Sequence, residues 1–189
     1  MNFTVKTLLL PPIETKCYIV GDGKDAFVVD PASNADEIVA EAANTGMKIR
    51  AILLTHGHFD HIGALDELVR LTGADVYIHA LDKPMISDGY LNVSRLFFGE
   101  DIVQNSDVKT VGNGDVITVG SMKIAVMHTP GHTAGSVCYF VGDAVFTGDT
   151  MFEMGCGRTD LPTGDGAALQ KSLAALNEEI MGKTIYPGH

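Results

Sequence analysis

The sequence predicts an α/β fold in which two sheets lie together with helices on the outside. Short apolar segments typical of strands bracket helical segments in both halves of the chain, and several of them end at polar, glycine-containing loops. No heptad pattern, low-complexity tract or repeat of about 20 to 50 residues is present. A length of 189 residues fits one domain whose core needs no disulfide or structural metal.

Hydrophobic periodicity and turn residues define the elements of the first half. The turn at 21–23 separates two apolar runs, and Asn34 with Glu37 three residues later is typical of a helix N-terminus. Residues 49–54 form a mostly apolar run, the pattern of a strand buried on both faces. The expected elements are an edge strand over 3–9, strands over 17–20 and 27–30, a helix from Asn34 to Gly46, a strand over 49–54, a helix over 64–71 and a strand over 76–78.

The second half is less regular. Residues 80–107 carry a weak pattern, and we expect a short helix and a mobile loop there. The apolar run 96–98 within this segment fits two interpretations equally, a dimer or substrate-lid patch or a part of the core. The remaining expected elements are short strands within 108–126, a hairpin around 142–143, a helix over 167–176 and a strand over 184–186.

Composition and charge exclude several classes of protein. Acidic residues outnumber basic ones by 24 to 13, for a net charge of -11, which disfavours nucleic acid and anionic membranes as partners. The run 8–10 ends at two prolines, too short for a signal peptide, and no stretch approaches the roughly 20 apolar residues of a membrane span. Cys17, Cys138 and Cys156 form no regular framework. We therefore expect a cytoplasmic protein, with secretion as the alternative.

Histidines crowd into one segment. Three of the seven lie in the sequence HGHFDH at 56–61. Imidazoles and carboxylates are the usual ligands of zinc and iron, and so many could not be buried cheaply without a cation. The spacing of His56 and His58 is not the i, i+4 spacing of a helical pair, so we expect both on a loop that leaves a strand. His79 and His128 are expected to be ordinary core or surface residues.

Three distant segments supply matching side chains. His132 lies in the turn TPGHT, Asp149 ends an apolar strand in TGDT, and His189 closes the chain in YPGH. Ligands on strand-end loops are typical of an active site, whereas a structural zinc more often uses close pairs of cysteines. The sequence therefore favours a catalytic metal centre.

These motifs resemble the metallo-β-lactamase superfamily over the full length of the chain. The resemblance implies an αββα four-layer sandwich with two mixed sheets and helices outside. It also implies two divalent metal ions, for which zinc is the favoured metal and iron or manganese are alternatives. The implied ligands are His56, His58 and His132 for the first metal, Asp60, His61 and His189 for the second, and Asp149 as the bridge. His189 is the final residue, although a ligand at the end of a strand normally has chain beyond it. We therefore expect residues 1–189 to be a single domain that lacks its extreme C-terminal segment.

Four further residues have assigned roles. By the resemblance, Asp30 would orient a ligand through a hydrogen bond; the alternative is a turn-starting aspartate before proline. Arg158 is expected either to bind a substrate carboxylate or to pair with Asp160. Cys156 is expected to be a small buried residue between two glycines, rather than a reactive thiol.

Within the superfamily, the segment GCGRTD at 155–160 is similar to short relatives of glyoxalase II, the hydroxyacylglutathione hydrolases. This resemblance implies hydrolysis of a small-molecule thioester by a metal-bridging hydroxide, with Asp60 as a catalytic residue that holds or deprotonates the water. A redox di-iron role is disfavoured because His58 stands where such proteins carry an acidic residue. True β-lactamases usually lack the aspartate found at Asp149.

Three alternatives stay open. The first is a persulfide dioxygenase that binds one iron through the positions of His56, His132 and Asp149, a two-histidine, one-carboxylate triad. The second is a lactone or other ester hydrolase of the same fold. The third is a metal-loaded binding module without turnover. The sequence does not define the oligomeric state.

Overall fold

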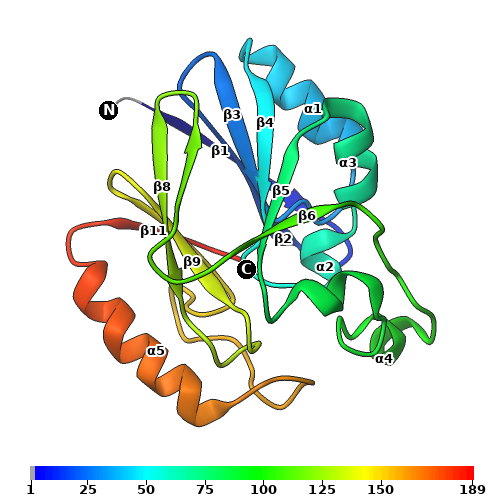
Figure 1. The fold of residues 1–189 in the computed structure, drawn as a ribbon, viewed down its shortest axis with the longest axis vertical. Helices are drawn as coiled ribbons and strands as arrows, with labels where there is room; N and C mark the ends of the chain where they lie inside the picture. The colour runs from blue at the N-terminus through cyan, green and yellow to red at the C-terminus, as the bar shows by residue number, and fades with distance from the viewer. Residues whose placement is uncertain (1–2) are drawn as a thin grey trace.

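Two mixed β-sheets form the centre of the protein, seen in a computed structural model that describes residues 3–189 (Figure 1). In the first sheet, β1 to β3 pair antiparallel and β3 to β6 pair parallel. Its strands, in spatial order, are β1 (Thr4–Leu10), β2 (Thr15–Gly21), β3 (Asp25–Val29), β4 (Lys48–Leu53), β5 (Asp75–His79) and β6 (Val108–Val111). The second sheet runs in the order β11 (Thr184–Pro187), β10 (Ala144–Gly148), β9 (Val137–Val141), β8 (Met122–His128) and β7 (Val116–Val119).

Helices cover the outer face of each sheet (Figure 1). The helices α1 (Ala35–Asn44) and α3 (Leu65–Thr72) pack on the first sheet, and α5 (Gly166–Glu179) packs on the second. Three short helices lie near one end of the sheets: α2 (Phe59–Ile62), the 3-10 helix η1 (Lys83–Ser87) and α4 (Ser94–Phe98). The predicted sandwich of two mixed sheets with helices outside is confirmed.

Strand periodicity divides the core into layers. In β4, Leu53 points between the sheets, where it packs near Phe27 and Phe146, while Ile52 points to the helices α1 and α3. Both faces of this strand are therefore buried, because side chains alternate across a sheet. On the outer face of the second sheet, Cys138 and Val145 are buried against Leu176 of α5.

The start of α1 differs from the sequence-based expectation. Asn34 occupies the N-cap position, but its backbone is left-handed, with φ 55°, and its side chain caps no backbone amide. Instead the Asn34 Nδ2 donates to the Glu37 carboxylate at 3.2 Å. The predicted N-cap position of Asn34 is therefore confirmed, but its side chain bonds Glu37 rather than a backbone amide of the helix.

Several strands end at the same edge of the sandwich. β4 leads into the HGHFDH segment, β8 into the loop of His132, β10 directly into Asp149, and β11 into His189. Residues far apart in the sequence thus meet at one site. No helix within residues 3–189 is long and apolar enough to cross a membrane.

Candidate metal centre

The HGHFDH segment leaves β4 as a loop and then forms α2. His56, His58 and His61 are all buried. Gly57 packs so closely against Met85 and the Asp82 carbonyl that a side chain would collide with them. The loop is therefore seated against η1, which fixes the direction of the histidines on either side of Gly57.

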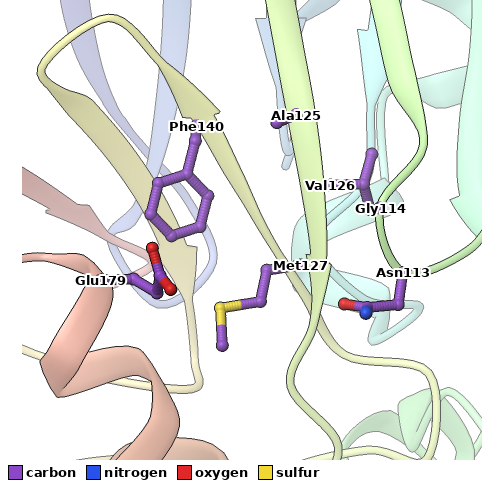
Figure 2. Close-up of a pocket in the computed structure, with 7 residues that line it drawn as sticks. All are labelled: Asn113, Gly114, Ala125, Val126, Met127, Phe140 and Glu179. Carbon is purple, nitrogen blue, oxygen red and sulfur yellow. The ribbon is translucent and has the colours of Figure 1, made fainter.

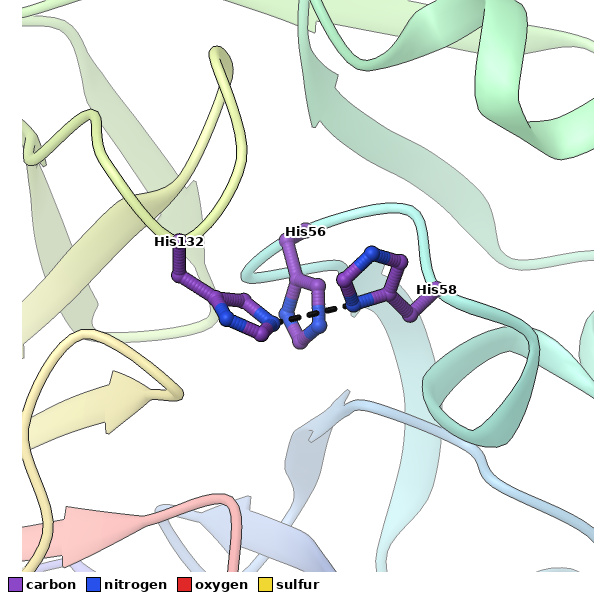
Figure 3. A group of neighbouring side chains, drawn as sticks. All are labelled: His56, His58 and His132. Atoms are coloured by element: carbon purple, nitrogen blue, oxygen red, sulfur yellow. Dashed lines mark hydrogen bonds between the residues drawn. The ribbon is translucent and has the colours of Figure 1, made fainter. Parts of the chain in front are cut away.

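Three imidazoles form a first group of candidate ligands (Figure 3). His56 and His58 come from the loop after β4, and His132 comes from the turn after β8. One ring nitrogen from each lies within 4.8 Å of the other two. The His132 Nε2 and the His58 Nδ1 are 2.9 Å apart, and Figure 3 shows these rings converging on one point.

A second group consists of Asp60, His61 and His189, whose ligand atoms also lie within 4.8 Å of one another. The Asp60 Oδ2 is 3.2 Å from the His61 Nε2 and 3.3 Å from the His189 Nε2. Two adjacent residues of α2 therefore meet the residue that follows β11 at a common point.

Asp149 lies between the two groups. Its Oδ1 is 3.5 Å from the His61 Nε2, and its Oδ2 is 3.5 Å from the His132 Nε2 and 3.8 Å from the His189 Nε2. One carboxylate thus turns an oxygen toward each group. This is the position in which a carboxylate can bridge two cations.

Hydrogen bonds orient the imidazoles by their Nδ1 atoms. Asp30 accepts a hydrogen bond of 2.6 Å from the Thr55 hydroxyl, which in turn lies 3.1 Å from the His56 Nδ1. The His61 Nδ1 donates directly to Asp30 at 2.9 Å, and the His132 Nδ1 donates to a backbone carbonyl, that of Arg158, at 2.8 Å. In these three rings the Nδ1 therefore carries a proton and the Nε2 faces the site, whereas His58 turns its Nδ1 toward His132.

The predicted orienting position of Asp30 agrees with this geometry. Asp30 is 1% exposed and has a left-handed backbone, with φ 52°, which is uncommon for a residue other than glycine. Its carboxylate holds two of the histidines, one directly and one through Thr55. Strain of this kind persists only where the surrounding contacts fix the conformation.

Buried atoms without partners test whether a metal fits the site. The Nε2 atoms of His56, His58 and His61 and the Oδ1 of Asp149 are buried and make no hydrogen bond. An unpaired buried polar atom costs about 1 to 3 kcal/mol, so four in one place need an explanation. Imidazole nitrogens and carboxylate oxygens are the donors that zinc, iron and manganese accept. The residues present therefore fit two divalent cations.

The pKa shifts of the first group agree with ligation by neutral imidazoles. Burial lowers the pKa of His56, His58 and His132, so these rings are neutral at neutral pH. Burial also opposes charge on His61, but Asp60 and then other carboxylates raise its pKa well above the ordinary value. The second group thus attracts positive charge more strongly than the first.

The last residues are held by β2. The Lys16 backbone amide donates to the Gly188 carbonyl at 2.8 Å, and the Tyr18 hydroxyl donates to the Pro187 carbonyl at 2.6 Å. The Thr15 hydroxyl donates to Asp60 at 3.1 Å. These three β2 residues were not predicted, since nothing in their spacing marks them as neighbours of the site.

Asp82 connects the two histidine loops and was also missed. Its buried carboxylate accepts hydrogen bonds from the Gly57 amide at 3.1 Å, the Thr133 hydroxyl at 2.6 Å and the Gly135 amide at 2.7 Å. Gly57 separates His56 from His58, and Thr133 follows His132. One carboxylate therefore fixes the loops that bring the first group together.

The segment GCGRTD lies at the rim of the site. The Arg158 guanidinium makes two hydrogen bonds to Asp160, of 2.6 and 2.7 Å, which is one of its two expected roles. Its backbone carbonyl, rather than its charge, contacts His132. The prediction of a buried Cys156 is wrong: this thiol is exposed, because it lies in an irregular segment whose residues 153–156 are all exposed.

A cavity of about 230 Å³ opens onto the two groups. Besides metal-binding candidates it is lined by apolar side chains, among them Val93, Phe97 and Leu161. Another cavity, of about 390 Å³, lies on the outer face of the second sheet near the end of α5 (Figure 2). The ionisable residue that lines this second cavity is Glu179, so its chemistry is not that of the metal centre.

The fold, the two ligand groups and the bridging position of Asp149 define a protein of the metallo-hydrolase class. The chain belongs to the metallo-beta-lactamase superfamily, whose sequence model matches residues 10–189. The predicted membership of this superfamily is confirmed.

Two relatives from Bacillus subtilis are similar to this protein over nearly the whole chain. "Probable metallo-hydrolase YqgX" of Bacillus subtilis is 35% identical and matches 90% of this chain and 80% of its own length. "Probable polyketide biosynthesis zinc-dependent hydrolase PksB", also of Bacillus subtilis, is 31% identical and matches 100% of this chain and 80% of its own.

Solved structures share the same architecture. The B3 metallo-beta-lactamase BLEG-1 superposes with a TM-score of 0.89 at 33% identity, over 98% of this chain and 91% of its own. TTHA1623, in a di-iron-bound form, superposes with a TM-score of 0.85 at 33% identity, over 98% and 92% of the two chains.

Proposed function

We propose that this protein is a binuclear metal-dependent hydrolase that cleaves a small-molecule thioester, as glyoxalase II does. The observation that carries the proposal is the position of Asp149, which turns one oxygen toward each of two complete ligand groups. A fold relative named as a zinc-dependent hydrolase and a structure in a di-iron form support zinc, with iron or manganese as alternatives. The free thiols of the chain agree with the cytoplasmic location that we propose.

Different residues of the site have different roles in this reaction. His56, His58 and His132 would hold one cation, Asp60, His61 and His189 the other, and Asp149 both. When bound, two such cations supply a water of lowered pKa and an electrophile for the carbonyl group. Asp60 faces the space between the two ligand groups, so its carboxylate can hold that water and accept its proton. The Thr15 hydroxyl keeps the Asp60 carboxylate in place by a hydrogen bond.

The apolar wall of the cavity contributes to the same reaction. Val93 and Phe97 line it together with the carboxylates of Asp60 and Asp149. An apolar wall lowers the local dielectric and strengthens electrostatic contacts within the site. A thioester suits this arrangement because its leaving thiolate needs little help from a protein acid, so no further proton donor is required.

A persulfide dioxygenase is the second candidate, since the three residues that it would use also meet here. The His132 Nε2 is 3.5 Å from Asp149, and His56 belongs to the same group. That activity needs one iron and leaves Asp60, His61 and His189 without a role. The close packing of this second group favours the hydrolase.

The test combines metal analysis with two assays on the purified protein. We expect about two metal ions per chain and hydrolysis of lactoylglutathione that continues without oxygen. We expect His58→Ala to lower the rate at least about 10²-fold through lost metal affinity, while the matched histidine variant His79→Gln stays near the wild-type rate. One iron per chain, with oxygen uptake on glutathione persulfide, would establish the dioxygenase instead. A β-lactam and a lactone complete the substrate set, because BLEG-1 carries the lactamase name.

A further inference from the structure

Large apolar side chains are exposed beside the metal centre. Leu96 on α4 is 70% exposed, and Tyr90 in the turn before it is 62% exposed. Phe97 and Phe98 are about half exposed, yet both rings contact Phe59 of the HGHFDH segment, with centroids 5.7 and 5.2 Å away. A cluster of this kind at the rim of an active site marks a binding surface more often than an accident of packing.

Two of these side chains, Tyr90 and Leu96, line a groove next to the metal cavity. The groove has a volume of about 420 Å³ and is lined mainly by apolar atoms. Leu161 lines both the groove and the metal cavity, so a molecule can extend from one into the other. The lining residues of the groove are Tyr90, Arg95, Leu96, Asp160, Leu161 and Pro162.

The charges at the groove disfavour an anionic occupant. The Arg95 guanidinium makes hydrogen bonds of 2.8 and 2.7 Å to Asp101, and the Arg158 guanidinium is paired in the same way with Asp160. A substrate carboxylate would have to displace one of these aspartates, in a protein whose net charge is -11. A neutral, apolar group meets no such competition.

Hydrogen bonds fix the conformation of the segment that carries Leu96. Val93 has φ 62°, which is an outlier for a β-branched residue, and its buried side chain lines the metal cavity. The Asn92 side chain holds this conformation, accepting from the Ser94 amide at 3.0 Å and donating to the Ile102 carbonyl at 2.8 Å. Strain sustained in this way is typical of a segment that positions a ligand.

We propose that the groove beside α4 binds a neutral apolar arm of the substrate while the thioester carbonyl lies at the metal centre. This inference rests on the proposed function and makes it more specific: the enzyme prefers aliphatic thioesters over those recognised by charged groups. The arm belongs either to the acyl side or to the thiol side of the thioester, and the two sides share the same chemistry.

Two substrate series test the proposal. The first contains the acetyl, butanoyl, hexanoyl and octanoyl thioesters of N-acetylcysteamine, and the second contains acetyl thioesters of alkanethiols of increasing length. We expect kcat/KM to rise about twofold to fourfold for each added methylene in one series, from the transfer energy of a partly or fully buried CH₂. We expect Leu96→Ser to lower the octanoyl-to-acetyl ratio, or its thiol counterpart, at least about threefold. The control Met181→Ser, at an apolar residue beyond α5 that is 82% exposed, keeps the wild-type ratio.

The ratio within one preparation is independent of metal occupancy and of the fraction of folded enzyme. Chain-length dependence that is absent from both series, while short thioesters are cleaved, overturns the groove and leaves the proposed function intact. If no thioester is cleaved, the proposed function fails, and calorimetry with the methyl and octyl thioethers of N-acetylcysteamine decides the groove. The groove is supported if the octyl compound binds more tightly than the methyl compound and if this preference weakens in Leu96→Ser. Equal affinities for the two compounds overturn the groove.

Discussion

Replacing Asp82 by asparagine tests how the two histidine loops are held together. The substitution keeps the shape of the side chain but turns one NH₂ group toward donors. If the amide replaces Oδ1, the Gly135 amide loses its acceptor, and if it replaces Oδ2, the Gly57 amide and the Thr133 hydroxyl lose theirs. Either orientation leaves at least one buried donor unpaired, at a cost of about 1 to 3 kcal/mol, and removes a charge-assisted contact.

One effect opposes this loss. Burial raises the pKa of Asp82, so keeping its carboxylate ionised inside the protein is itself unfavourable, and asparagine removes that cost. We therefore expect a net destabilisation of about 1 to 3 kcal/mol in urea unfolding of the metal-free protein. Because the loops carry His56, His58 and His132, the zinc affinity should fall about tenfold or more in competition with a chelating dye.

A matched variant separates this effect from the loss of a charge. Asp75 is exposed and pairs with Lys109 at 2.7 Å on the surface of the first sheet. Asp75→Asn should change the stability by less than about 0.5 kcal/mol and leave the zinc affinity unchanged. The reasoning is refuted if Asp82→Asn is as stable as Asp75→Asn and binds zinc as tightly.

Three further predictions concern the orienting contacts, the thiols and the stacked histidines. Asp30→Asn should weaken zinc binding about 10- to 100-fold in the same dye competition, because an NH₂ facing the Nδ1 of His61 selects the tautomer whose Nε2 is protonated; unchanged affinity would contradict this. In native protein, iodoacetamide should label Cys156 alone, whereas labelling of the two buried thiols before denaturation, seen by mass spectrometry, would argue against the structure. Burial, and then the nearby His128, lower the pKa of His79, so the unfolded chain takes up its proton first and stability is lost as pH falls below about 6.5. His79→Gln should lose less stability than wild type between about pH 8 and pH 5.5 in urea unfolding, and an equal or larger loss would show that this ring is not the cause.

The ligand types and the strand pattern could be predicted from the sequence because each depends on local spacing. The mostly apolar run of β4 indicates burial on both faces, and the structure shows Leu53 between the sheets and Ile52 beneath the helices. The HGHFDH segment cannot be a helical metal pair at its spacing, and His56 and His58 do lie on the loop before α2.

Residues whose role depends on long-range contacts could not be predicted. Asp82 is a single aspartate in a segment of weak pattern, and its partners lie 25 to 53 residues away. Thr15 and Tyr18 are ordinary strand residues by sequence, and only the neighbouring path of the last residues gives them a part in the site. The exposure of Cys156 likewise depends on an irregular backbone path that flanking glycines permit but do not dictate.

Leu96 shows how the structure decides between alternatives that a sequence leaves open. The apolar run 96–98 is compatible with core packing or with a substrate surface. In the structure the two phenylalanines contact Phe59, while Leu96 faces the groove. One short helix therefore serves both purposes, because its successive side chains point to different sides.

Anomalous diffraction from crystals grown with zinc, measured on both sides of the zinc absorption edge, tests the central claim most directly. The account predicts two peaks, one within bonding distance of His56, His58 and His132 and one within bonding distance of Asp60, His61 and His189, with an oxygen of Asp149 directed at each. A single peak held by the first group alone, or zinc bound elsewhere while these side chains keep their direct contacts, would contradict it.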